Sequence, residues 1–359
     1  MDVRKLSAWC LAAYLLLSTI IIVPIACVST FIMIMPLLLV NRPLFLKLEN
    51  RLCQLVNDHW ATCSYFCGLQ VIEYGDDISA ITDKRVLFLA NHQGFFDNHV
   101  IMNSLQDKGK VPGSYLWVIY NIWKCTPLGV MWTIHGNFFV NGGPKNRERE
   151  LGEFRKLLSD YFWSWNYGWV VMYPEGSRLF KIRESSARFA EKNGLAPLRH
   201  CTYPRLGAAH ALMQVCAPSK EDATGSRSGG GPPMDYIVDA TLGYTKGRVI
   251  DLGSALMGEW PLGTGKTCIH YKIHKVKPEY ADEEKLKDFL YELYKEKDDL
   301  LDKFYRTDDF PGEKRTVQLS TTTIIASQVF WGALYYAHYS LWIAPLCSTV
   351  LSAITSFLF

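Results

Sequence analysis

Two short polar runs in this sequence have residue types that could do chemistry, and each follows an apolar run. The first is Asn91-His92-Gln93-Gly94-Phe95-Phe96-Asp97, directly after Val86–Ala90. If Asp97 begins a helix, its carboxylate can fold back onto His92, orient the ring and stabilise the imidazolium. Such a histidine would be a general base, worth roughly 10²- to 10⁴-fold in rate. The alternative is a loop histidine beside an N-capping aspartate, and this run alone does not decide between them.

The second run is Tyr173-Pro174-Glu175-Gly176-Ser177-Arg178, which follows the apolar residues 169–172. Its arginine suits a phosphate group, and the neighbouring glycine would let backbone N–H groups approach that phosphate. Because ligands of α/β sheets bind beyond the carboxyl ends of the strands, this run is also a candidate for a binding site. The alternative is a β-turn with a surface ion pair.

The elements that would position these runs alternate between strands and helices. Apolar runs predict strands at 86–90, 115–119, 137–140, 169–173, 236–242 and 268–276. Helical spacing of apolar residues predicts helices over 147–161 and 283–305. The alternation predicts an α/β fold with a mixed, largely parallel sheet flanked by helices. Residues 218–233 are rich in Gly, Ser and Pro and predict a flexible loop.

Both ends of the 359-residue chain are apolar, since residues 6–41 and 316–359 contain no Asp, Glu, Lys or Arg. A straight membrane span needs about 20 residues. Residues 9–40, with Pro24 and Pro36, predict either one kinked span or a re-entrant helical hairpin in one leaflet. Residues 323–359, with Pro345 and a belt of aromatic side chains, predict one or two passes.

The expected domain organisation follows from these patterns. We expect a membrane segment over 1–41 and a water-facing domain over 42–315 with a helical extension at about 276–311. A second membrane segment would cover 316–359. The 38 basic and 35 acidic residues give a net charge of +3, which argues against a nucleic-acid-binding protein.

Cysteine usage favours a reducing, cytosol-facing side, because the 10 cysteines form no CxxC pair. His59, Cys63 and Cys67 have helical spacing, but no fourth ligand lies nearby, so we expect no metal. The aromatic residues between Tyr161 and Trp169 could line an apolar tunnel or reach lipid headgroups, although core packing is the better interpretation for most of them.

In combination, the two polar runs resemble motifs of the glycerophospholipid acyltransferases, the lysophosphatidic acid acyltransferase superfamily. Gly136-Asn137-Phe138-Phe139-Val140-Asn141, which lies between them, is similar in part to a third motif, G-x-x-F-[IV]-x-R. Asn141 stands close to the place of that motif's phosphate-binding arginine. Either Lys145, Arg147 or Arg149 supplies the charge, or the headgroup is recognised differently. Tyr203-Pro204-Arg205-Leu206-Gly207 is similar to the P-R-x-x-G form of the branch with lysophosphatidylglycerol and lysocardiolipin acyltransferases, but Gly207 stands one residue early.

The resemblance implies an acyl-CoA-dependent O-acyltransferase in the endoplasmic reticulum membrane, with acyl-CoA as a substrate and no cofactor. His92 would take the proton of a lysophospholipid hydroxyl while Asp97 holds the ring, and His99 is the rival base. Lysophosphatidylglycerol is the first candidate acceptor; lysophosphatidylinositol, lysophosphatidylethanolamine, lysophosphatidic acid and lysocardiolipin are alternatives. The implied substrate-binding residues are Glu175, Gly176, Ser177, Arg178, Gly136, Phe138, Asn141, Pro204 and Arg205.

Two other classes of function stay open on the sequence. One is a non-catalytic membrane protein that keeps the fold in order to bind lipid. The other is a membrane-anchored hydrolase, although no Ser lies in a G-x-S-x-G nucleophile context. Release of CoA without any lysophospholipid would indicate the hydrolase.

Overall fold

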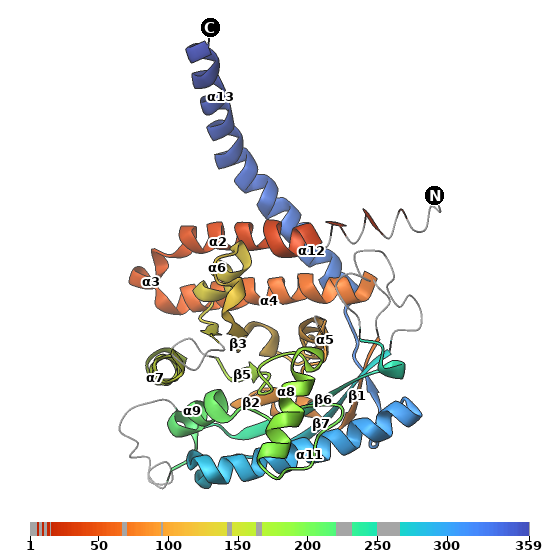
Figure 1. Cartoon of the computed structure of the whole chain (residues 1–359). Helices are drawn as coiled ribbons and strands as arrows, with labels where there is room; N and C mark the ends of the chain where they lie inside the picture. The colour runs from red at the N-terminus through yellow and green to blue at the C-terminus, as the bar shows by residue number, and fades with distance from the viewer. Residues whose placement is uncertain are drawn as a thin grey trace.

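The computed structural model describes residues 6, 9–10, 13–14, 16–66, 70–94, 96–141, 146–162, 167–219, 232–249 and 266–358. Most of the loop predicted at 218–233 lies outside these residues. The centre of the molecule is an eight-stranded sheet in the order β4-β3-β5-β2-β6-β7-β1-β8 (Figure 1). Among the strand pairs in the described residues, only β6–β7 and β1–β8 are antiparallel. The predicted mixed, largely parallel α/β fold is therefore confirmed.

The strands are β1 Gln70–Gly75, β2 Val86–Ala90, β3 Tyr115–Tyr120, β4 Phe138–Val140, β5 Trp169–Met172, β6 Tyr236–Tyr244, β7 Lys266–Lys275 and β8 Arg315–Thr316. All five residues of β2 are buried, because this strand lies between β5 and β6 and both faces of the sheet are covered. The six predicted strands are present, whereas β1 and β8 were not predicted. Glu73 interrupts the apolar pattern of β1, and it is buried in an ion pair with Lys108 (Nζ–Oε2, 3.0 Å).

The α-helices are α2 Val23–Ile34, α3 Leu37–Val40, α4 Arg42–Phe66, α5 Asp97–Ser104, α6 Pro127–Ile134, α7 Arg147–Leu157, α8 Leu179–Lys192, α9 Leu206–Cys216, α11 Glu283–Thr307, α12 Thr321–His338 and α13 Ala344–Leu358. Single π-helical turns are η1 Ser18–Ile22, η6 Leu158–Phe162 and η11 Tyr339–Ile343. Short 3₁₀ turns are η2 Ile78–Ile81, η3 Val111–Gly113, η4 Asn121–Trp123, η9 Thr245–Gly247 and η10 Pro278–Ala281.

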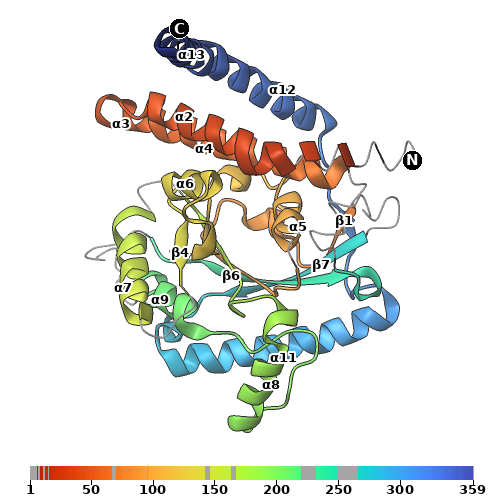
Figure 2. The same ribbon diagram turned by 45° about the horizontal axis from the view of Figure 1, so that its top comes forward.

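The helices cover the sheet in two layers (Figures 1 and 2). On one face, α5 and α6 lie between the sheet and α4, and α2 lies along α4. On the other face, α11 crosses the whole sheet, beside α7 and α9. Alternate residues of β2 supply the two cores: Phe88 faces the α4 side, whereas Leu87 and Leu89 face the α7, α9 and α11 side.

The described part of the N-terminal apolar segment reverses direction across residues Met35–Asn41, which include the short helix α3, and the returning arm is the amphipathic helix α4. Pro24, one of the two prolines that could break this segment, does not interrupt α2, in which it is the second helical residue. A π-helical turn precedes Pro24, and another precedes Pro345 near the C-terminus. Widening the helix before a proline accommodates its missing N–H and the clash of its ring with the preceding turn.

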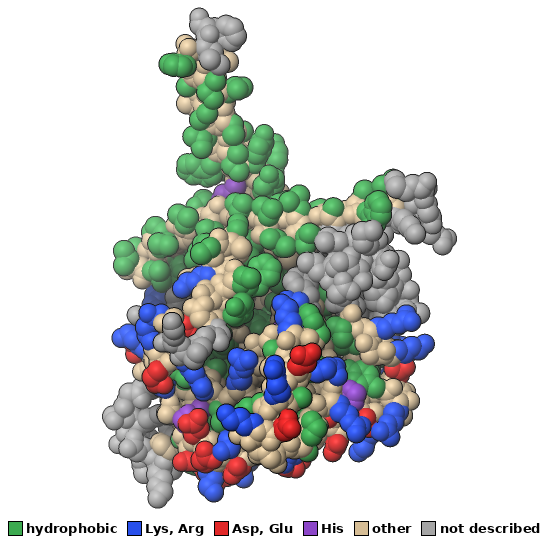
Figure 3. All heavy atoms as spheres, in the orientation of Figure 1, with side chains coloured by type: hydrophobic (Ala, Val, Ile, Leu, Met, Phe, Trp, Pro, Cys, Tyr) green, Lys and Arg blue, Asp and Glu red, His purple; other side chains and the backbone are tan. Residues whose placement is uncertain are grey.

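The C-terminal helix is long and apolar enough to cross a membrane. Residues Thr321–Phe357 form a helical stretch of 37 residues whose most apolar window has a mean hydropathy of 1.5, and none of that window is buried. Hydrophobic side chains gather on α12, α13 and the neighbouring α2–α3 end of the molecule, whereas charged side chains cover the opposite end (Figure 3). The apolar helix Ser18–Ile34 is shorter.

Candidate active site

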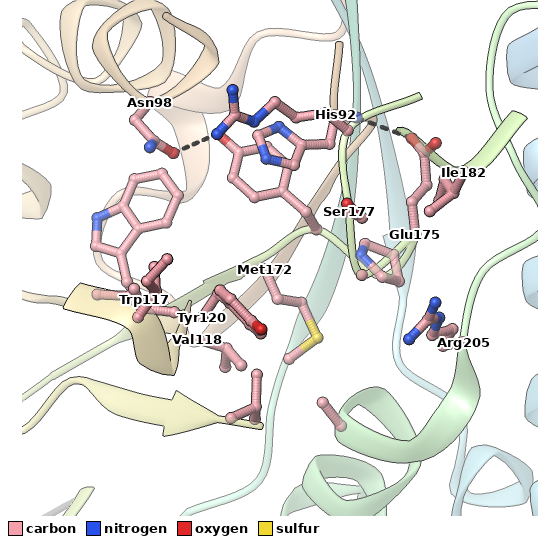
Figure 4. A pocket seen from close by; sticks show the side chains of 18 of the residues that line it. His92, Asn98, Trp117, Val118, Tyr120, Met172, Glu175, Ser177, Ile182 and Arg205 are labelled. Carbon is pink, nitrogen blue, oxygen red and sulfur yellow. Dashed lines mark hydrogen bonds between the residues drawn. The ribbon is translucent and has the colours of Figure 1, made fainter. Parts of the chain in front are cut away.

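The two polar runs meet because they follow adjacent parallel strands. His92 follows β2 and Glu175 follows β5, so both lie beyond the carboxyl edge of the sheet. A cavity of about 1270 Å³ opens at this edge, and its wall includes His92, Tyr120, Asn141 and Glu175 from the ends of four strands. Figure 4 shows His92 and Glu175 on one side of this cavity and Trp117, Val118 and Tyr120 of β3 on the other.

The carboxylate of Asp97 holds the ring of His92. Asp97 begins α5 and is fully buried, and its Oδ2 lies 2.7 Å from His92 Nδ1. The same oxygen accepts hydrogen bonds from the backbone N–H groups of Gln93 (2.6 Å) and Gly94 (2.9 Å). Tyr244 in β6 donates its hydroxyl to Oδ1. The carboxylate is thus fixed on both oxygens and leaves Nε2 of His92 as the ring nitrogen available to a ligand.

The face of the His92 ring is fixed as well. The ring stacks on Tyr173, with 4.2 Å between the ring centroids and 15° between the planes. Tyr173 is itself held by Asn98, because its hydroxyl donates to Asn98 Oδ1 at 2.7 Å. Burial raises the pKa of the Tyr173 hydroxyl well above its usual value, so the phenol is neutral.

His99 has a different environment from His92. It also lines the cavity, but its ring stacks on Trp60 with 5.3 Å between the centroids. Burial lowers the pKa of His99 to about 4, which makes it a weak proton acceptor near neutral pH. His92 is hydrogen-bonded to the carboxylate of Asp97, whereas His99 is stacked on the indole ring of Trp60. This difference favours His92 as the base.

Glu175 connects the two polar runs through backbone groups. Its Oε1 accepts the N–H of His92 at 2.8 Å, and its Oε2 accepts both the N–H and the hydroxyl of Thr202 at 3.1 Å. The side chain is buried, and this burial raises its pKa to about 8. Both oxygens are therefore engaged with the protein, although Glu175 contributes to the cavity wall.

Gly176 forms the turn that follows Glu175. Its φ of +75° lies in the left-handed region, and its N–H donates to Tyr173 O at 3.0 Å. A Cβ atom at this position would lie 3.0 Å from Cδ of Arg205, so a side chain would press against that arginine.

Four cationic side chains line the cavity. They are Arg147 on α7, Arg178 and Lys181 at the start of α8, and Arg205 just before α9. Among the residues that the structure describes, none of the four forms an ion pair with an acidic side chain. The acidic side chains in the wall, Glu150 and Glu175, instead accept backbone N–H groups, from Asn141 in the case of Glu150 (2.8 Å). Cations without local counter-charges suit a phosphate-bearing ligand.

The remaining sequence candidates divide into two groups. Ser177, Pro204 and Asn141 line the cavity beside the cations. Gly136 and Phe138 lie outside its wall, where Phe138 packs on Phe154 with 4.6 Å between ring centroids. These two residues therefore help to place β4 and do not contact the cavity.

The three proposed substitutes for the missing arginine also differ. Arg147 lines the cavity, whereas Arg149 pairs with Glu153 (3.7 Å) on the exposed side of α7. Lys145 lies outside the described residues.

The far end of the cavity is apolar and extends towards α4, α6 and the N-terminal helix. Its wall there includes Trp60, Leu128, Trp132 and Ile20. Of the aromatic residues between Tyr161 and Trp169, the three whose side chains the structure describes do not line the cavity: Phe162, Tyr167 and Trp169 are buried in the core. Trp163 and Trp165 lie outside the described residues.

Several residues that hold the site had no recognisable signal in the sequence. Tyr244 lies within a strand, and Thr202 lies in a loop that precedes α9. Asn91 was visible as part of the first run; its side chain exchanges two hydrogen bonds with Leu242 of β6 and so joins the end of β2 to that strand.

Comparison with known proteins agrees with this geometry. Residues 264–331 match the family model described as Acyltransferase C-terminus. The chain is 48% identical over 99% of its length to a Caenorhabditis elegans protein provisionally named 1-acyl-sn-glycerol-3-phosphate acyltransferase acl-12, of which it covers 91%. It is 32% identical over 85% of its length to mouse acyl-CoA:lysophosphatidylglycerol acyltransferase 1, of which it covers 84%.

A solved structure is similar with a TM-score of 0.47 and 15% identity, covering 83% of this chain and 98% of that one: the 1-acyl-sn-glycerophosphate acyltransferase PlsC from Thermotoga maritima. The 48% identity to acl-12 along nearly the whole of both chains shows the family. The chain therefore belongs to the lysophosphatidic acid acyltransferase family of glycerophospholipid acyltransferases, and it is an acyl-CoA-dependent lysophospholipid acyltransferase.

Proposed function

We propose that His92 is the general base of this acyl transfer and that Asp97 orients it. The observation that supports the proposal is the 2.7 Å contact between His92 Nδ1 and the buried carboxylate of Asp97, at the wall of the large cavity. Nε2 takes the proton of the acceptor hydroxyl as its oxygen attacks the thioester carbonyl carbon. The C–S bond then breaks, and the leaving CoA sulfur takes the proton back from the imidazolium. No covalent enzyme intermediate is needed.

The two ends of the cavity suit the two parts of these substrates. Arg147, Arg178, Lys181 and Arg205 provide a cationic end for the phosphates of the lysophospholipid and of CoA. The apolar end, with Trp60 and Trp132, provides space for an acyl chain. His92 lies in the wall of the same cavity, so one bound molecule can reach both its phosphate contacts and the base.

We propose lysophosphatidylglycerol as the first acceptor to test. The mouse relative is named for that substrate, and the chain resembles the same branch at Pro204-Arg205. Lysophosphatidic acid is the second candidate, because acl-12 is named for it and four cations suit a doubly charged phosphate monoester. Lysophosphatidylinositol, lysophosphatidylethanolamine and lysocardiolipin complete the series.

The test is the release of CoA thiol by the detergent-purified protein, with palmitoyl-, stearoyl- or oleoyl-CoA and each lysophospholipid in turn. We expect release only when a lysophospholipid is present, together with the matching diacyl product by mass spectrometry. The acceptor with the largest kcat/KM names the substrate. Folded protein that releases no CoA with any acceptor would support the lipid-binding alternative, and release without an acceptor would support the hydrolase.

We also propose that the enzyme lies in the endoplasmic reticulum membrane with its catalytic domain in the cytosol. The apolar surface of α12 and α13 supports a membrane anchor, and the lack of any CxxC pair among the 10 cysteines of the sequence supports a reducing side. Protease treatment of intact microsomes tests the orientation. Digestion of the domain without detergent is the expected result, and protection until detergent is added would overturn it.

A further inference from the structure

The loop formed by residues 199–202 lies between the catalytic run and α11, and two buried carboxylates hold its backbone. Asp298 on α11 accepts the N–H groups of Arg199 (3.0 Å), His200 (2.6 Å) and Cys201 (3.1 Å) through Oδ1. Its Oδ2 also accepts Arg199 N–H at 3.0 Å. The next N–H, that of Thr202, goes to Glu175 Oε2 at 3.1 Å. Four successive backbone donors thus converge on two carboxylates.

This loop also contacts the residues that follow β2. Glu175 holds Thr202 with one oxygen and the N–H of His92 with the other. Gln93, the next residue, donates its side-chain amide to His200 O at 2.5 Å. A continuous series of hydrogen bonds therefore connects α11 to the backbone on which the base is mounted.

The residues that follow this loop line the cationic end of the cavity. Pro204 and Arg205 follow Tyr203 directly and line the cavity, and the N–H of Arg205 donates to Pro174 O at 2.7 Å. A displacement of residues 199–202 would consequently change the positions of both His92 and Arg205.

Helix α11 itself is tied to the sheet beside Asp298. Lys297 is fully buried, and its Nζ lies 2.6 Å from Asp239 Oδ1 and donates to Ala240 O at 2.7 Å, both in β6. β6 is the strand next to β2 in the sheet. The pair Lys297–Asp298 thus connects the sheet on one side to the loop on the other, which makes α11 a rigid support for that loop.

We infer that Asp298 is a positioning residue: through the loop 199–202 and Glu175 it sets the place of His92, and through the same loop it sets the place of Arg205. This gives the C-terminal family segment, which contains α11, a role in catalysis beyond covering the sheet. The inference rests on the proposed function of His92. Displacement of a catalytic group by about 1 Å can cost on the order of 10²-fold in rate, so a distant support of this kind matters.

The test compares Asp298→Asn with Asp299→Asn, which makes the same chemical change at the next residue. Asp299 is exposed and is on the same helix, so it controls for the loss of a charge on α11. We expect Asp298→Asn to lower kcat by about tenfold or more and to raise KM for the phosphate-bearing acceptor through Arg205. Asp299→Asn should keep both values. Thermal unfolding curves show that the comparison is made on folded protein.

A double-mutant cycle separates positioning from a general loss of stability. If Asp298 acts through Glu175, the variant Asp298→Asn/Glu175→Gln should lose no more kcat than the worse single variant. If Asp298 and Glu175 act independently, the fold-losses in kcat of the two single variants should multiply in the double variant. If Asp298→Asn does not fold, Thr202→Val is the substitute, because it removes the hydrogen bond from the Thr202 hydroxyl to Glu175. Thr202→Val should lower kcat. Its combination with Glu175→Gln should lose no more kcat than the worse single variant.

The result that overturns this inference is a wild-type kcat and KM in folded Asp298→Asn. The His92→Ala variant distinguishes failure of the proposed function from failure of the positioning role of Asp298. If His92→Ala is inactive while Asp298→Asn is normal, the catalytic role of His92 stands and the positioning role of Asp298 is wrong. If His92→Ala is itself active, the proposed function fails first, and the effect of Asp298→Asn has to be explained without His92.

Discussion

At the scale of single residues, Asp97 has two structural tasks that are both local. It holds His92 through Oδ2, and it accepts the backbone of the turn at Gln93 and Gly94. An asparagine would place an N–H₂ group against one of these donors and would favour the wrong tautomer of the ring.

We therefore predict that Asp97→Asn lowers kcat by roughly 10²- to 10⁴-fold with little change in KM for acyl-CoA. Steady-state CoA release measures both constants. Tyr244→Phe is the matched control, because it removes only the hydroxyl that donates to the other oxygen of Asp97. Its loss should be much smaller, and equal losses in the two variants would contradict the tautomer argument.

Glu175 gives a prediction for pH. Burial raises its pKa from 4.5 to about 8, so the folded protein holds a proton there that the unfolded chain loses at lower pH. The stability that this proton contributes is fully present below about pH 4.5 and is lost as the pH rises through about 8.

Thermal unfolding in detergent between these two pH values tests this prediction. The midpoint of the wild type should fall as the pH rises, and Glu175→Gln should reduce that slope because glutamine cannot ionise. Parallel curves for the two proteins would show that Glu175 is ionised in both states.

How far the site could be predicted depended on the distance between its residues in the sequence. His92 and Asp97 are five positions apart, so one motif specified their contact. The hydrogen bonds that Tyr244 donates to Asp97 and that the Arg199 N–H donates to Asp298 span 147 and 99 positions, and no local pattern indicates them. Gly136 and Phe138 belong to a partly matching motif, but neither lines the cavity, because Gly136 precedes β4 and Phe138 packs into the core against Phe154.

At the scale of elements, α7 decides which basic residue reaches the cavity. Arg147 is its first residue and lines the cavity, whereas Arg149 lies on the exposed side of the helix and pairs with Glu153. The sequence could name both as replacements for the missing arginine, but only the rotation of α7 about its axis separates them.

We predict that Arg147→Ala raises KM for a phosphate-bearing substrate by about tenfold or more, because a charge-assisted hydrogen bond is lost. Arg149→Ala should leave KM unchanged, since an exposed ion pair contributes little. Separate KM measurements for acyl-CoA and for the lysophospholipid show which phosphate Arg147 serves. If neither constant changes in Arg147→Ala, this arginine is not part of the binding site.

Not every strand could be predicted from the sequence. The runs that became β2, β5 and β6 are apolar and were predictable, because both faces of the sheet are covered. β1 contains Glu73, which is buried in an ion pair with Lys108 outside the strand, and β8 has only two residues, so neither has the expected pattern. Both pair at the edge of the sheet far from the cavity, which is why the site could be predicted without them.

At the scale of the whole molecule, α12 is attached to the rest of the protein by polar contacts. Gln328 donates its amide to Thr62 Oγ1 (3.2 Å) and lies 2.7 Å from His59 Nδ1, and Trp331 donates its indole N–H to Leu55 O at 3.0 Å. All three partners are on α4, which lies between this helix and the catalytic domain (Figure 2).

Two truncations follow from this attachment. A chain that ends at residue 338 keeps α12 and should retain the unfolding midpoint and the detergent-solubilised activity of the full protein. A chain that ends at residue 320 loses these contacts and should unfold at a lower temperature, because the buried polar groups on α4 lose their partners. Equal midpoints for the two truncated proteins would show that α12 does not support the fold.

The central claim is that His92, held by Asp97, is the base for acyl transfer. The most direct measurement is the rate of acceptor-dependent CoA release by His92→Ala beside the wild type, in detergent and with matched unfolding curves. The account predicts a loss of roughly 10²-fold or more in kcat, with the protein folded and acyl-CoA still bound. A folded His92→Ala protein with near-wild-type kcat would contradict it and would leave the His92–Asp97 pair with a structural role alone.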